Sequence, residues 1–320
     1  MAREKDSLQK IRWGTVLRLT PLAVFVIWSL DFAWVLWAEP PAQKTFSSPA
    51  QATRALFLAA QAHDTRALLK IFGSDGREII SSGNAVEDKN RREQFVRKYR
   101  EMSRLVEEPD GTVRLYVGAE NWPMPVPLVK KDNAWYFDTA AGKREIRFRE
   151  IGRDEIAAIR VLQELVAAQR EYYAEPRDGG IRQYAQKLGS DENKHNGLYW
   201  KTASGQPESA IGPHLAHAAR DTYPADSKSR AKPFNGYYFE VLTKQGEQAA
   251  GGAKDYIVDG KMTGGFAFLA YPAQYATSGV MTFIVSEDGI IYQKDLSAKT
   301  AEYAQTVREY NPDKEWVRIE

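Results

Sequence analysis

The chain of 320 residues contains no cysteine. This absence excludes disulfides, thiolate zinc sites and cysteine nucleophiles, but it does not assign a compartment, because many exported bacterial proteins also lack cysteine. An excess of basic residues is missing too: residues 1–38 hold 5 of the 44 basic and 3 of the 42 acidic residues, so residues 39–320 carry equal numbers of both. Because proteins that bind nucleic acid normally carry a basic excess, we expect no nucleic-acid partner.

Long hydrophobic runs are scarce, and the one that stands out lies near the N-terminus. Residues 1–18 are polar and basic, and Leu19–Leu30 is almost entirely apolar. This order is typical of an export signal, with Ala38 as the small residue before the cleavage site. The alternatives are an uncleaved anchor over residues 19–38, which Asp31 opposes, and an ordinary buried helix. Both the signal and the anchor place the bulk of the protein outside the cytoplasm, in the periplasm or cell envelope.

The rest of the chain is long enough for two cores. We divide the sequence into an export signal or anchor (residues 1–38), a proline-rich linker (39–45), a first domain (46–150) and a second domain (151–320). Both domains mix helices and strands, so the expected fold class is α+β.

The first domain is expected to begin with helices and to end in a sheet. Ser48 is an N-cap followed by Pro49 at the first helical position, and Asp64 or Thr65 caps a second helix. The remaining expected elements are a helix across Val86–Val106, strands at Val113–Val117, Val126–Lys130 and Trp135–Phe137, and a hairpin turn at residues 132–133. This element order resembles the cone-shaped NTF2-like (nuclear transport factor 2-like) fold.

Such cones often enclose a pocket, which makes the first domain a candidate ligand-binding site. Trp122 opens the run WPMPVP, whose alternate prolines force an extended backbone. That run either rims a ligand pocket, receives a partner, or protects an edge strand, and the last role is the commonest. Tyr99 and Asp64 are the other candidate ligand-binding residues. Together with His63 they are also the acid–base candidates if the domain is an enzyme, although Asp64 already serves as a helix cap.

The second domain is predicted to place one long helix over an antiparallel meander. Gly152 ends the preceding element, Asp154 caps the helix and Pro176 terminates it. The apolar stripe of this helix comprises Ile156, Ile159, Leu162, Leu165, Val166, Gln169, Tyr172 and Tyr173. The expected strands are Tyr237–Leu242, Tyr256–Val258, Gly265–Tyr271, Met281–Val285 and Ile290–Gln293, joined by glycine-containing turns. A last helix near Tyr303 and Val307 is expected to dock Trp316.

The order of the second domain is similar to that of the soluble head of type IV pilins and pseudopilins. The residues that match are Ala157, Leu162, Leu165, Ala168, Gln169 and Tyr172 in the helix, and Gly236, Tyr237, Phe239, Asp288, Gly289 and Tyr292 in the strands. A pilin's helix continues N-terminally as an apolar polymerising stalk, whereas a whole domain takes that place here. The resemblance therefore implies a shared fold rather than polymerisation by the pilin route.

A pair of histidines is the candidate metal site. His214 and His217 stand at positions i and i+3 of a short helix expected over residues 211–220, a spacing that lets both reach one ion. The only further ligands at hand are His195 and Asp221, and two histidines on a surface helix are more often solvated. We expect no cofactor.

Taken end to end, the chain after its signal resembles a bacterial family known only as domain of unknown function 2950 (DUF2950). The resemblance is carried by Leu128–Ile146, Ile151–Tyr173, Asn196–Trp200, Gly236–Leu242 and Tyr256–Asp295. It implies an exported or envelope protein and brings no known activity or catalytic residues.

Because no catalytic motif interrupts either domain, the leading hypothesis is a non-enzymatic binding or interaction module. Its expected partner is an envelope protein or a small apolar ligand, and contact with the membrane is expected only through the N-terminal segment if that segment is uncleaved. The alternatives are a pilin-like assembly or secretion accessory subunit, and an enzyme or small-ligand binder that uses the first-domain pocket.

Overall fold

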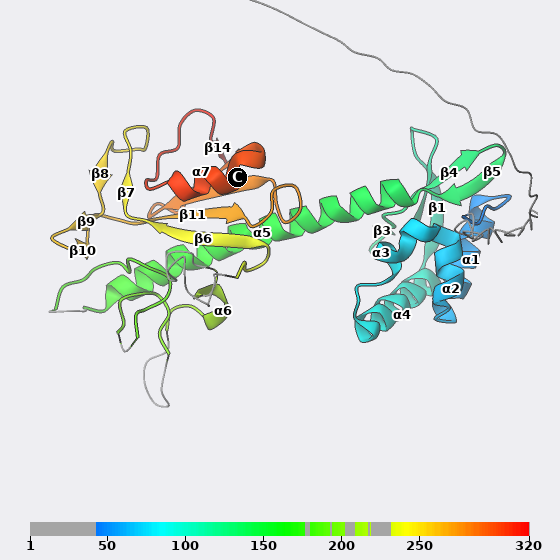
Figure 1. Cartoon of the computed structure of the whole chain (residues 1–320), viewed down its shortest axis with the longest axis horizontal. Helices are drawn as coiled ribbons and strands as arrows, with labels where there is room; N and C mark the ends of the chain where they lie inside the picture. The colour runs from blue at the N-terminus through cyan, green and yellow to red at the C-terminus, as the bar shows by residue number, and fades with distance from the viewer. Residues whose placement is uncertain are drawn as a thin grey trace, which may run out of the picture. The chain divides into compact units, whose positions relative to one another are not determined.

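Helices and antiparallel sheets make this chain an α+β protein, as the sequence predicts (Figure 1). The structure is a computed structural model that describes residues 43–176, 180–192, 194–201, 209–216, 218 and 232–319. The predicted export signal or anchor, residues 1–38, lies outside the described residues. Among the helices that are described, none has the length and apolar character needed to cross a membrane.

The first half of the described chain places helices ahead of an antiparallel sheet. The helices are α1 (Pro49–Gln61), α2 (Thr65–Phe72), α3 (Arg77–Ile80) and α4 (Ala85–Glu101), with a 3-10 turn at Ser74–Gly76. The strands are β1 (Ser103–Glu107), β2 (Val113–Val117), β3 (Trp122–Pro123), β4 (Leu128–Lys131) and β5 (Ala134–Phe137). They form the order β1-β2-β4-β5, with β3 paired to β2.

The predicted local signals of this half are confirmed. The Ser48 hydroxyl accepts a hydrogen bond from the Gln51 N–H at 3.2 Å and so caps α1, which has Pro49 in its first turn. Asp132 and Asn133 form the hairpin turn between β4 and β5, and both have positive φ values, 49° and 62°. Paired positive φ values are typical of a type I′ turn, and they explain why Asp and Asn stand there.

The predicted helix across Val86–Val106 is wrong at its end. α4 stops at Glu101, Met102 has extended backbone, and Ser103–Glu107 is the edge strand β1. The helical spacing of Phe95, Tyr99 and Met102 continues to Val106 only by coincidence. Pairing with β2, in which Leu105 lies opposite Leu115, supplies the backbone hydrogen bonds that a longer helix would otherwise have made.

The long helix also differs from its prediction, because it begins earlier. α5 runs unbroken for 36 residues, Thr139–Ala174, and the Asp138 carboxylate caps it by accepting from the Ala141 N–H at 2.9 Å. Gly152 therefore does not end an element, and Asp154 caps nothing. A glycine inside a helix costs only about 1 kcal/mol, which a long helix packed along its length tolerates.

The predicted division at residue 150 falls inside α5, yet the buried residues still form two clusters. One cluster extends from Phe46 to Phe137, and the other from Ala158 to Trp316. The first turns of α5 belong with the first half, where Gly142 makes room for the Val126 side chain. Its later turns carry Leu162 and Leu165 into the second cluster.

The second half is built on a five-stranded antiparallel sheet. Its strands are β6 (Tyr237–Leu242), β11 (Ala267–Pro272), β12 (Met281–Ser286), β13 (Ile291–Asp295) and β14 (Val317–Arg318), in the order β14-β13-β12-β11-β6. Two small ribbons interrupt the meander: β7 (Lys244–Gln245) with β8 (Lys254–Asp255), and β9 (Ile257–Val258) with β10 (Lys261–Met262). The helices are α6 (Pro213–Ala216) and α7 (Thr300–Thr306), with a 3-10 turn at Ser297–Lys299. The predicted strand Tyr256–Val258 therefore lies outside the main sheet.

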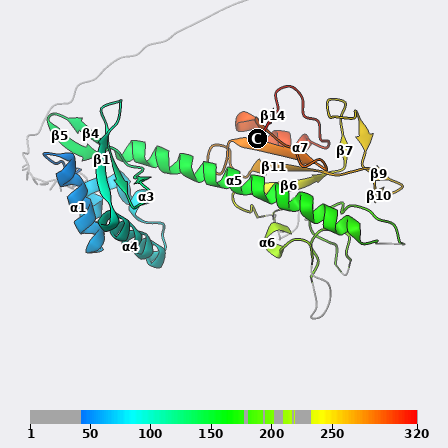
Figure 2. The same cartoon turned by 180° about the vertical axis from the view of Figure 1, so that it is seen from behind.

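Helices cover this sheet on both faces, α5 on one and α7 on the other (Figures 1 and 2). Side chains of a strand alternate between faces, so Phe239, Phe268 and Phe283 lie on the α5 side, and the neighbours of Phe268 and Phe283 along their strands, Leu269 and Ile284, lie on the α7 side. The predicted helix stripe is largely confirmed. Ile156 is the exception, because its side chain is 52% exposed.

Polar contacts fix the position of α5 on the sheet. The Glu155 carboxylate accepts hydrogen bonds from the backbone N–H groups of Val280 and Met281 at 2.9 and 3.0 Å. Four turns later, the Arg170 guanidinium donates to the Glu287 carbonyl at 2.9 Å. The predicted docking of this helix on the aromatic strands is thus confirmed and is anchored at both ends of β12.

Gly142→Ala and Gly152→Ala are a matched pair of substitutions in α5. A Cβ atom at Gly142 would lie 2.6 Å from Cγ2 of Val126, whereas one at Gly152 would meet nothing within 4 Å. We expect Gly142→Ala to lower the free energy of unfolding by about 1–3 kcal/mol through overpacking. Gly152→Ala should raise it by up to about 1 kcal/mol through helix propensity. Urea denaturation followed by circular dichroism measures both; equal stabilisation would contradict the packing of Val126 on α5.

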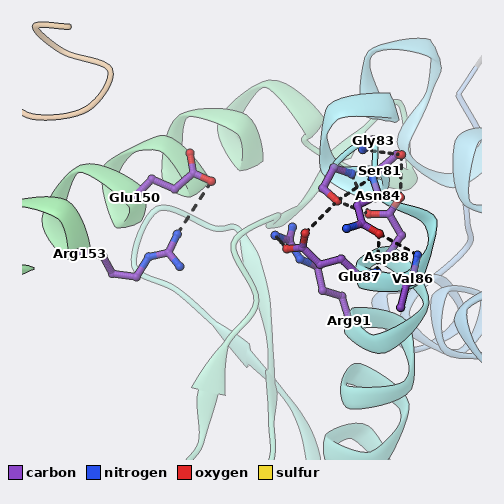
Figure 3. A network of polar contacts seen from close by, with 10 residues as sticks. Ser81, Gly83, Asn84, Val86, Glu87, Asp88, Arg91, Glu150 and Arg153 are labelled. Atoms are coloured by element: carbon purple, nitrogen blue, oxygen red, sulfur yellow. Dashed lines mark hydrogen bonds and ion pairs between the residues drawn. The ribbon is translucent and has the colours of Figure 1, made fainter. Parts of the chain in front are cut away.

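Glu155→Gln tests the anchor between α5 and the sheet. Loss of the charge weakens two hydrogen bonds to backbone N–H groups, so we expect the free energy of unfolding to fall by about 1–3 kcal/mol. Glu150→Gln is the control, since Glu150 is exposed and only approaches Arg153 at 4.0 Å (Figure 3). That surface pair is worth less than about 1 kcal/mol. Equal losses in the two variants would rule out the anchoring role of Glu155.

Candidate functional site

The three ligand-binding candidates of the first half lie on separate elements. Trp122, on β3, is 40% exposed and has the Arg149 guanidinium 5.0 Å from its ring centroid. Tyr99, on α4, stacks on Phe57 with ring centroids 4.6 Å apart. Asp64 caps α2 by accepting from the Ala67 N–H at 2.9 Å. Each of these side chains has a packing or capping role in the structure. That the three form a ligand site stays a prediction.

His63 lines a small hollow between the end of α1 and α4. The hollow has a volume of about 190 Å³ and is lined by Ala60, Gln61, His63, Glu93, Val96, Arg97 and Arg100. His63 Nε2 lies 4.0 Å from Glu93 Oε1, and both side chains are about 40% exposed. None of Trp122, Tyr99 or Asp64 lines this hollow, so the structure does not bring the acid–base candidates together there.

The histidine pair can be followed only in part. His214 is exposed on α6, whereas His217 lies outside the described residues. His195, named as a further ligand, stacks on Trp200 with ring centroids 4.8 Å apart. Within the described ranges, no group of three or more histidine, aspartate or glutamate side chains is placed to hold a metal ion.

A polar network before α4 is structural. The Asp88 carboxylate accepts from the Ser81 hydroxyl at 2.7 Å (Figure 3). It also accepts from the N–H and the hydroxyl of Ser82, at 2.7 and 2.8 Å. The Ser82 backbone N–H is the main reason that the pKa of Asp88 lies below its usual range. Because Ser81 and Ser82 of the preceding loop donate to the Asp88 carboxylate, this network fixes the loop against the first turn of α4.

A larger pocket lies on the α7 side of the second sheet, and we take it as the candidate functional site. Its volume is about 360 Å³. The lining residues are Lys244 from β7, Ile284 from β12, Tyr303 and Thr306 from α7, and Val307, Arg308, Glu309, Asn311, Asp313 and Trp316 from the segment that follows. Most of the wall is therefore the C-terminal segment laid over the sheet.

Backbone hydrogen bonds hold that segment against β7. The Tyr310 N–H donates to the Lys244 carbonyl at 2.9 Å, and the Gly246 N–H donates to the Tyr310 carbonyl at 3.0 Å. Asn311 Oδ1 accepts from the Gln248 N–H at 2.8 Å. A Cβ at Gly246 would lie 2.4 Å from the Asn311 side chain, so glycine is required for this close approach. The frame of the pocket is thus fixed without a ligand.

Charged groups in and beside the pocket divide into paired and unpaired ones. Lys294 lies 2.7 Å from Glu315 and 3.6 Å from Asp313, and its ammonium is 5.8 Å from the Trp316 ring centroid. The hydrogen bond to Glu315 is the main reason that the pKa of Lys294 is raised. Burial raises the pKa of Tyr310 to about 12, so the phenol under the pocket wall stays neutral.

Lys244, Arg308 and Glu309 behave differently from that paired set. Among the residues that the structure describes, none of these three side chains has an ion-pair partner. Arg308 spends one N–H on the carbonyl of its neighbour Val307, at 2.8 Å. The pocket therefore presents uncompensated charges of both signs above an apolar floor.

Sequence reasoning placed the last helix and the docked Trp316 correctly but missed the pocket between them and β7. α7 ends at Thr306, one residue before the predicted Val307, and Trp316 is buried. The signal available in the sequence was the charged and polar run from Arg308 to Asp313 between a short helix and a buried tryptophan. Nothing in the sequence pairs that run with Lys244, about 60 residues earlier.

The molecule is thus an α+β protein with two hydrophobic cores and a polar pocket on its second sheet. It belongs to the family described as protein of unknown function DUF2950, whose family model matches residues 43–319. This confirms the family predicted from the sequence. No curated protein and no solved structure matches the chain. The likeness of its halves to NTF2-like cones and pilin heads stays a prediction.

Proposed function

We propose that this protein is an exported, non-enzymatic binding protein of the cell envelope that holds a small ligand in the pocket beside α7. The observation that carries the proposal is the pocket itself, a hollow of about 360 Å³ that is framed by backbone hydrogen bonds and lined by apolar and charged residues. Ligand pockets in proteins have volumes of about 300–1,000 Å³ and combine an apolar lining with a few polar groups.

Binding fits the lining better than catalysis does. The lining residues include no histidine and no cysteine, and the Asp313 carboxylate is engaged by Lys294 and by the Glu315 N–H at 2.8 Å. The Thr306 hydroxyl donates to the Tyr303 carbonyl at 2.8 Å, so it is not hydrogen-bonded to an adjacent base as nucleophilic catalysis requires. The charged and polar side chains of the lining can instead bind a ligand without reacting with it.

A substitution that fills the pocket tests this function. Thr306 is the exposed last residue of α7 and lines the pocket, so Thr306→Trp should occupy it. Glu302→Trp, exposed on α7 and absent from the lining, is the control. The full-length protein is screened by thermal shift and calorimetry against amino acids, dipeptides, monosaccharides and nucleotides. We expect a ligand that binds the wild type and Glu302→Trp but binds Thr306→Trp at least tenfold more weakly; no ligand, or binding that survives Thr306→Trp, would refute the proposal.

Export is supported by the basic start of the chain and the apolar run Leu19–Leu30. We expect the full-length protein, made in a bacterial host, to be accessible to protease added outside the inner membrane. Mass spectrometry should find Glu39 as the new N-terminus if the signal is cleaved, and an intact residue 1–38 segment in the membrane fraction if it is an anchor. A variant that lacks residues 1–38 is the control and should stay in the cytoplasm; full-length protein that also stays there would disprove export.

A further inference from the structure

The unpaired charges of the α7 pocket define what kind of ligand it takes, provided that the proposed binding function holds. Lys244 lies on β7, whereas Arg308 and Glu309 follow α7, so basic and acidic residues line one pocket from two sides. In the same region Lys294, Asp313 and Glu315 satisfy one another. Among the described residues, Lys294 is thus paired with carboxylates, whereas the lining residues Lys244, Arg308 and Glu309 have no ion-pair partner.

Ligands that carry one sign of charge suit this lining poorly. An anion would gain from Lys244 and Arg308 but would face the Glu309 carboxylate in the same pocket. A neutral sugar can hydrogen-bond to these groups but supplies no counter-charge to any of the three. A ligand with both an anionic and a cationic group compensates both sets of charges at once.

The size and the apolar part of the lining favour a small ligand with a hydrophobic middle. Ile284, Val307 and Trp316 supply the apolar part of the lining. A volume of about 360 Å³ lies near the lower end of the range for ligand sites, about 300–1,000 Å³, so the ligand has few heavy atoms. Free amino acids and short peptides carry a carboxylate, an ammonium and a compact apolar side chain within such a volume.

We infer that the pocket binds a small zwitterion of the amino-acid or short-peptide class. Lys244 and Arg308 bind its carboxylate, and Glu309 binds its ammonium group. Arg308 suits this role because a guanidinium has five N–H donors, of which the Val307 carbonyl takes one. The hydrogen bonds of Tyr310 and Asn311 hold the backbone that carries Arg308 and Glu309 beside Lys244.

Calorimetry on the full-length protein tests the inference with two dipeptides, Ala-Ala and Ala-Phe, each in three forms: free, N-acetylated and C-amidated. We expect the free form to bind and each blocked form to bind at least tenfold more weakly. The reason is that a blocked terminus loses its hydrogen bonds to a charged side chain. C-amidation leaves the size of the probe nearly unchanged, whereas N-acetylation adds three heavy atoms, so charge-removing variants are needed to separate the loss of the ammonium charge from the added bulk.

Three charge-removing variants assign the termini to side chains. Lys244→Gln and Arg308→Gln should each weaken the free dipeptide about tenfold while leaving the weak binding of the amidated form unchanged. Glu309→Gln should do the converse, weakening the free form and sparing the N-acetylated one. Arg318→Gln, exposed on β14 and outside the lining, is the matched control and should change neither.

The outcomes separate this inference from the proposed function. Equal binding of the free and blocked forms, or a loss on blocking only one terminus, would overturn the zwitterion class. Failure of both dipeptides, together with a different ligand that Thr306→Trp excludes, would overturn it too, while leaving the binding function standing. If no probe binds the wild type at all, both the inference and the proposed function fail.

Discussion

The structure of the second half depends on the packing of α5 against one face of a five-stranded sheet. Leu162, Leu165 and Val166 are buried there among the phenylalanines of β6, β11 and β12. Each such side chain contributes about 1.5–3 kcal/mol when it leaves water, so the stripe is a large stabilising term. That term alone would permit the helix to slide, because apolar contacts have little direction. Glu155 removes this freedom, since its carboxylate accepts from two consecutive backbone N–H groups at the start of β12.

Once α5 occupies one face, the chain has to cover the other, and the way it does so creates the pocket. α7 is only seven residues long and leaves part of the sheet for the segment that follows it. That segment crosses back to β7, pairs there through Tyr310, and returns to bury Trp316 before β14 closes the sheet edge. An irregular segment covers a sheet less completely than a helix does, so a hollow above Ile284 follows from this path.

The elements that local rules specify were predictable, and those that depend on distant partners were not. Ser48 and Pro49 start α1, and Asp132 and Asn133 form their hairpin, because each acts within a few residues. β6 was predicted at its observed bounds, Tyr237–Leu242, from aromatic and β-branched residues alone. The prediction that a helix extends to Val106 was wrong because this residue lies in β1, which pairs with β2. The prediction that an element ends at Gly152 was wrong because the packing of α5 outweighs the cost of one glycine. The pocket beside α7 could not be predicted from the sequence, because Lys244 and Arg308 are distant in the chain and line one pocket only in the folded protein.

The location of the pocket has a consequence for the stability of the C-terminal segment. The segment from Val307 to Trp316 is irregular, and it is held by backbone hydrogen bonds at Tyr310, by the Asn311 side chain and by the buried side chains of Tyr310 and Trp316. Under the proposed function, a ligand that contacts both Lys244 on β7 and Arg308 on the segment would bind the folded segment and not the unfolded one. At one hundred times its dissociation constant, such a ligand would add about 2.7 kcal/mol to the stability of the folded state. Ligand binding and the packing of the C-terminal segment on β7 would then stabilise each other.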